Sequence, residues 1–141
     1  MKKYILFLVL FIVKVYAQEF SFHPELEWYT IKGKHCFVHF HKGAEFTAHL
    51  VAKIHDEIWG PITSLYDYEP EPTNYIIKDY DEYANGATYF FDNKIEIWAT
   101  ALDFDLRGTH NWLRNVITHE FTHMVQVQST LKFSRKMPVV Y

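Results

Sequence analysis

The spacing of apolar residues along the chain changes several times, and each spacing predicts a different element. Residues 28–31 and 35–40 have the composition and alternation of short strands and flank a turn at Gly33, which predicts a β-hairpin. Between residues 44 and 65 apolar side chains recur every three or four positions, which is typical of an amphipathic helix. Pro61 is expected to end or kink this helix because proline removes a backbone donor.

Two more strands are predicted after this helix. Residues 74–80 (NYIIKDY) have the composition of a short buried strand, and residues 95–102 (IEIWATAL) alternate between apolar and polar or small side chains. The stretch between them, residues 81–94, contains the turn signal Asn85-Gly86 and is expected to be a loop.

A second helix is predicted from about residue 110 to residue 129, after a loop over residues 103–109. Hairpin, helix, strand, strand and helix in this order predict an α+β fold, in which a mixed β-sheet packs against two main helices. A length of 141 residues is enough for one domain.

The start of the chain resembles a secretion signal. Two lysines precede an apolar run over residues 4–13 that is too short to span a bilayer comfortably, and a compact cleavage site precedes Gln18. Lys14 interrupts the segment, so a retained anchor is the alternative. We expect residues 1–17 to be a signal peptide, and residues 18–141 to be exported to the periplasm, cell envelope or medium without a stable membrane span.

Composition excludes some classes of function. Hydrophobic residues make up 49% of the chain, which favours a packed core over disorder. The net charge is −3, and it becomes −6 without the three lysines of the predicted signal, so a basic nucleic-acid surface is not expected. Cys36 is the only cysteine, which excludes an internal disulfide. A buried thiol is the expected role of Cys36, and a nucleophile is the alternative.

The most informative motif is "HEFTH", with His119 and His123 one helical turn apart and Glu120 beside the first. On a helix, His123 lies about 40° and Glu120 about 100° from His119, in a sector predicted to face the core. Polar groups facing a core need partners, and two imidazoles at this spacing can bind one Zn²⁺ while the carboxylate activates a metal-bound water. We predict His119 and His123 as zinc ligands and Glu120 as the catalytic base, with a satisfied polar cluster as the alternative.

From about residue 35 to 128 the chain resembles the N-terminal part of the thermolysin-like (gluzincin) metallopeptidases. The closest likeness is to the exported bacterial group whose domain often precedes a Tol-type β-propeller. The resemblance is carried by "ANGATYFFDNKIEIWATAL" and "NWLRNVITHEFTHMVQ". It implies the same zinc and base roles, a peptide or protein substrate, and a possible downstream propeller. It also implies an edge strand, at "IEIWA", that pairs with an extended peptide.

The sequence departs from this family at the third zinc ligand, which in the family is a glutamate on a later helix. Residues 124–141 contain no Asp, Glu, His or Cys. His110 falls on the opposite face of the helix, whereas Asp103 and Asp105 could reach the ion or orient a histidine. We therefore expect the front portion of a larger enzyme, which by itself binds zinc weakly and cleaves peptides poorly.

Two other functions stay open: an inert peptidase-fold module that binds proteins or supports a propeller in the envelope, and a structural domain with an accidental "HEFTH". Among the other histidines, the His39 and His41 pair could hold a metal, but no third partner for it is evident in the sequence. His39 and His41 share a strand face as surface or half-buried residues, and His49 and His55 are expected to be incidental on the first long helix.

Overall fold

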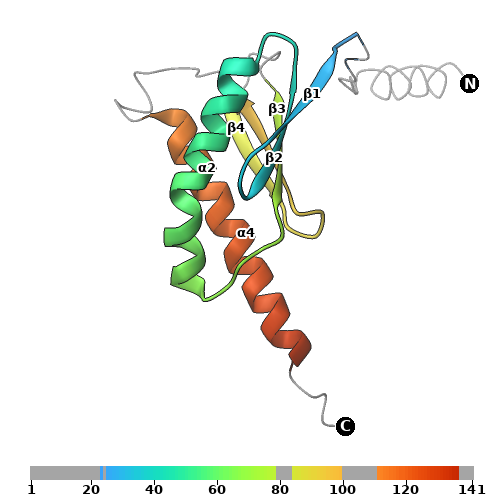
Figure 1. Ribbon diagram of the computed structural model, residues 1–141. Helices are drawn as coiled ribbons and strands as arrows, with labels where there is room; N and C mark the ends of the chain where they lie inside the picture. The colour runs from blue at the N-terminus through green and yellow to red at the C-terminus, as the bar shows by residue number, and fades with distance from the viewer. Residues whose placement is uncertain (1–22, 24, 79–83, 100–110, 137–141) are drawn as a thin grey trace, which may run out of the picture.

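One five-stranded mixed sheet and two long helices make up the part of the chain that the computed structural model describes, which is residues 23, 25–78, 84–99 and 111–136 (Figure 1). The sheet order is β1-β2-β3-β5-β4, with β2, β3 and β5 parallel and the two outer strands antiparallel to their neighbours. The predicted α+β class is confirmed. In chain order the elements are β1 (Trp28–Lys32), β2 (Cys36–His41), α2 (Glu45–Tyr66), β3 (Thr73–Lys78), β4 (Ala84–Tyr89), β5 (Lys94–Ala99) and α4 (Trp112–Lys136).

Both helices cover the same face of the sheet and lie side by side (Figure 1). Helix α2 packs on β1 and β2, and α4 packs on β4 and β5. Alternate residues of the three inner strands point into this layer, as a two-residue strand period requires. The fully buried strand residues are Cys36, Val38, Thr73, Tyr75, Ile77, Ile95 and Ile97.

The N-terminal hairpin and the first helix agree with the sequence pattern, except at Pro61. Strands β1 and β2 pair in register from Trp28↔His41 to Lys32↔Phe37. Helix α2 does not end at Pro61 but continues to Tyr66. Pro61 is exposed, so the carbonyl that loses its helical partner can bind water, while buried Ile62 and Thr63 keep the last turn on the core.

The expected loop over residues 81–94 is wrong for residues 84–89, which form the strand β4. This strand pairs antiparallel with β5, from Ala84↔Ala99 to Tyr89↔Lys94. Strand β5 is therefore an inner strand, and the expectation that "IEIWA" is the edge strand is also wrong. In "ANGATY" no branched aliphatic residue marks a buried face, and Asn85-Gly86 is a turn signal that here lies inside a strand.

The face of the sheet away from the helices carries a charge network that links β3, β5 and β4. Burial would raise the pKa of Glu96, but hydrogen bonds from Lys78 at 2.7 Å and Lys94 at 3.0 Å outweigh burial and lower it. The Lys94 ammonium also lies 4.3 Å from the centre of the Tyr89 ring. Cross-strand contacts of this kind stabilise a particular register.

The core holds polar groups that the sequence did not identify. His55 is fully buried and has a structural role that its position in the sequence did not indicate, whereas His49 is exposed. The His55 imidazole shares a hydrogen bond of 2.9 Å with the Tyr75 hydroxyl and packs edge-on against Phe121. The expected buried thiol is confirmed, because Cys36 is buried in the core. This burial raises its pKa to about 12, which favours the protonated thiol.

No helix in the described part of the chain is long and apolar enough to cross a membrane. The predicted signal peptide lies outside the described residues, as do the loop over residues 103–109 and His110.

We predict that His55 makes the fold sensitive to acid. Burial lowers its pKa from 6.5 to about 4, against the smaller opposing effects of Asp56 and the His35 backbone. Between these values the unfolded chain binds a proton that the folded chain does not. Stability from this group is therefore complete above pH 6.5 and falls by about 3 kcal/mol as the pH approaches 4.

Urea unfolding at several pH values measures this loss. His55→Gln keeps a hydrogen-bonding side chain for Tyr75 without a titrating group, so its stability should lack this part of the pH dependence. His49→Gln, on the exposed side of the same helix, should keep it. An equal slope in the parent and His55→Gln would contradict the assignment.

Candidate metal centre

Helix α4 carries the three motif residues on two different surfaces. Glu120 is 9% exposed and faces the sheet, while His119 and His123 are exposed. The expected core-facing placement is therefore confirmed for Glu120 and wrong for both histidines. The buried arc of α4 extends past Phe121 to Val125, which leaves the histidines at its border with solvent.

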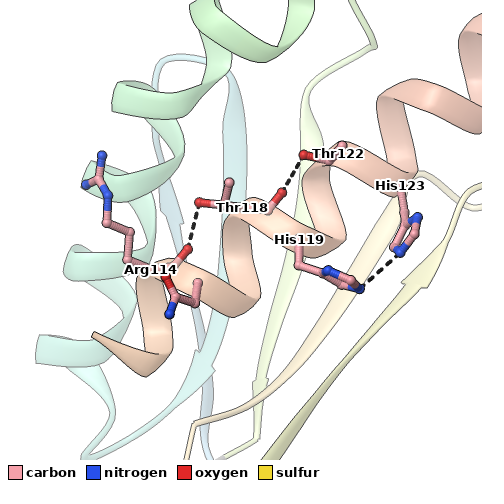
Figure 2. A pocket seen from close by; sticks show the side chains of 6 residues that line it. Arg114, Thr118, His119, Thr122 and His123 are labelled. Atoms are coloured by element: carbon pink, nitrogen blue, oxygen red, sulfur yellow. Dashed lines mark hydrogen bonds between the residues drawn. The ribbon is translucent and has the colours of Figure 1, made fainter. Parts of the chain in front are cut away.

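The two imidazoles converge on one point beside the helix. Figure 2 shows their rings turned toward each other, and the two Nε2 atoms are 3.0 Å apart. Two nitrogens bound to one tetrahedral zinc at roughly 2.0–2.1 Å are about 3.3 Å apart, so this arrangement is close to that of a shared ion. Without a metal, the same contact is a hydrogen bond in which one ring donates and the other accepts.

Glu120 lies under the edge strand β4. Its Oε2 accepts a hydrogen bond of 2.7 Å from the Thr88 hydroxyl, which also lies 2.9 Å from the Glu120 carbonyl oxygen. Gly86, on the same face of β4, leaves the space through which the glutamate side chain passes. A Cβ atom at this glycine would lie 2.7 Å from Glu120 Cγ and 2.5 Å from Val116 Cγ2.

Two surface hollows meet at His119. One runs along the outer side of α4 and is bordered by Arg114, Thr118, Thr122 and both motif histidines (Figure 2). The other lies between α4 and β4, where Asn85, Gly86, His119 and Glu120 form part of its wall. An ion bound there would therefore be open to solvent on one side and adjacent to Glu120 and strand β4 on the other.

The described residues bring together two side chains, His119 and His123, that could bind a metal. Within residues 23, 25–78, 84–99 and 111–136, no group of three His, Cys, Asp or Glu side chains is arranged to hold an ion. Catalytic zinc sites normally have three protein ligands, so the donor set fits zinc only in part. Asp103 and Asp105, the candidates for an additional role, lie outside the described residues.

The His39 and His41 pair shows no metal arrangement in the described part of the chain, and both side chains are half-buried as expected. The Nδ1 atom of His39 is 2.9 Å from the Thr30 hydroxyl, and His41 packs edge-on against Trp28. These contacts are ordinary cross-strand pairs between β1 and β2.

Sequence reasoning missed Gly86 and Thr88 as components of the site. The signal that could have identified them is the run of small residues in "NGAT", because a glycine within a strand often marks the close approach of another element. The Asn-Gly pair obscured this signal because it favours a turn.

We predict that Gly86→Ala separates α4 from β4. The added methyl group meets Val116 and Glu120 below the contact distance, so the helix or strand must shift, at a cost of about 1–3 kcal/mol in the free energy of unfolding. Chemical denaturation measures this cost. Ala87→Ser, on the outward face of the same strand, is the control and should change stability little. Unchanged stability in Gly86→Ala would contradict the close packing.

Comparison with models of protein families, with curated proteins and with solved structures finds no match to this chain.

Proposed function

We propose that this chain carries the zinc-binding and water-activating residues of an exported metallopeptidase domain. The observation that supports this most is the 3.0 Å separation of the His119 and His123 Nε2 atoms. The two rings present their Nε2 atoms to one position, which is the arrangement that a shared ion needs. The adjacent carboxylate of Glu120 adds the third chemical group that peptide hydrolysis by this route requires.

The proposed roles follow from the atoms that each residue presents. His119 and His123 hold the ion through Nε2. Zinc, when bound, supplies a water of lowered pKa and polarises the carbonyl under attack. Glu120 would act as the general base and then return the proton to the leaving amine, a role supported by its position beside the hollow between α4 and β4.

Strand β4 is the proposed support for the substrate backbone. It is the last strand of the sheet, and no other strand in the described part of the chain pairs with its outer edge. Asn85 and Gly86 of this strand border the same hollow as His119 and Glu120. An extended peptide could add to this edge by main-chain hydrogen bonds, which would bring its carbonyl groups past the proposed centre.

The inert peptidase-fold module is the second candidate, because the described residues supply only two metal ligands. In that case β4 would bind a partner without cleaving it. Both proposals are compatible with a downstream β-propeller. The site itself determines neither a partner nor a substrate.

Zinc titration of the full chain by calorimetry, with cobalt absorption as a second probe, tests the proposal. We expect one weakly bound ion whose affinity falls at least about tenfold in His119→Ala and in His123→Ala. His49→Ala removes an exposed histidine from α2 and should bind like the parent. Unchanged affinity in both motif variants would overturn the zinc site.

Peptide hydrolysis with added zinc separates the two candidates. Glu120→Gln should retain zinc and lose hydrolysis, because the amide cannot take a proton. A parent chain that binds zinc at the histidines but hydrolyses nothing would favour the inert module. Tight binding of one equivalent would instead require a third protein ligand, for which Asp103 and Asp105 are the first residues to change.

A further inference from the structure

We infer that Thr88 is a positioning residue that fixes the Glu120 carboxylate to the edge strand. The inference rests on the proposed function, in which Glu120 is the base. It adds that strand β4, through Thr88, fixes the position of the Glu120 carboxylate. Thr88 belongs to no part of the "HEFTH" motif and is 32 residues away from Glu120 along the chain.

The hydroxyl of Thr88 lies within bonding distance of both ends of Glu120. It is 2.7 Å from Oε2 and 2.9 Å from the backbone carbonyl oxygen of the same residue. A hydroxyl has one proton, so it donates to one of these acceptors at a time. The shorter contact, to the carboxylate, has the length of a charge-assisted bond. Such a pair of contacts restricts the rotation of the glutamate side chain.

Packing around Glu120 makes this hydroxyl important. The carboxylate belongs to a residue that is 9% exposed, and a buried charge without a donor is strongly unfavourable. Gly86 leaves room for the side chain to lie flat on β4, since a methyl carbon at this glycine would lie only 3.0 Å from Glu120 Oε1. The aliphatic part of Glu120 is thus placed by Gly86 and its charged end by Thr88.

The same strand offers its outer edge to an extended peptide in the proposed function. A displacement of β4 on peptide binding would therefore be transmitted through Thr88 to the carboxylate. In this way β4 would align the substrate and the base together, which is the kind of fixed geometry that proton transfer requires.

Carbodiimide labelling with glycine amide tests this inference without zinc or activity. Glu120 is the only carboxylate side chain in the tryptic peptide of residues 115–132, so its labelling rate can be read by mass spectrometry. Thr88→Val removes the hydroxyl at almost constant shape and should raise the labelling rate of Glu120 at least about threefold. Thr88→Ser keeps the hydroxyl and should label like the parent.

Glu96 is the internal reference, because its carboxylate is held by Lys78 and Lys94 on the other face of the sheet. Local release raises labelling of Glu120 alone, whereas unfolding raises labelling of both glutamates. If Thr88→Val unfolds, Thr88→Ala replaces it. Equal labelling of Glu120 in the folded hydroxyl-free variant and in the parent would overturn the inference. So would a Thr88→Ser protein that labels like Thr88→Val, since the methyl group would then be the important part.

Failure of the proposed function gives a different result. Thr88→Val leaves both imidazoles in place, so its zinc affinity should equal that of the parent. The proposed zinc site would be refuted by a zinc affinity that is unchanged in His119→Ala and in His123→Ala, and this result does not depend on the labelling of Glu120. Where hydrolysis is measurable, Thr88→Val should lower kcat more than it changes KM, and Thr88→Ser should restore kcat.

Discussion

The close contact between helix α4 and strand β4 is the constraint on which the candidate site depends. Gly86 allows it, since a methyl group at this position would lie only 2.5 Å from Val116 Cγ2. At this separation the Glu120 side chain reaches the Thr88 hydroxyl, and the neighbouring histidines remain at the helix border. A bulkier residue at Gly86 would separate the two elements and remove the polar contact together with the packing.

The rotation of α4 about its axis is set from the other side of the core. Phe121 packs on His55, whose ring is held by Tyr75 in the central strand β3, and Met124 and Val125 complete the buried arc. An ion pair between Arg114 and Glu57 of α2 lies on the surface and contributes little to stability. The apolar contacts therefore decide that Glu120 faces β4 and that His119 and His123 face outward.

This division of one helix between two environments suits metal-assisted hydrolysis. The proposed ligands would need access to an ion and to solvent, whereas the proposed base would need a fixed position and a hydrogen-bond donor. Two histidines four residues apart on an exposed helix face have this access through helical geometry alone. The second condition needs the sheet, and here it is provided by two small residues of an edge strand.

Most of the fold could be predicted from local periodicity. The hairpin, both helices and the strands β3 and β5 have clear alternating or helical patterns, and Cys36 was correctly assigned to the core. Strand β4 has no such pattern, because its helix-facing residues must be small and its outer edge is not covered by another described strand. Pro61 does not end the helix, and the buried Ile62 and Thr63 keep the last turn packed on the core.

The sequence by itself determined that two histidines and a glutamate lie within one turn of a helix, since that relation depends only on helical geometry. The tertiary structure alone decided which of them is buried, which strand borders them and which hydroxyl binds the carboxylate. These properties arise from contacts between residues far apart in the chain, and a local pattern of apolar and polar residues does not encode the distance between a helix and the strand beneath it.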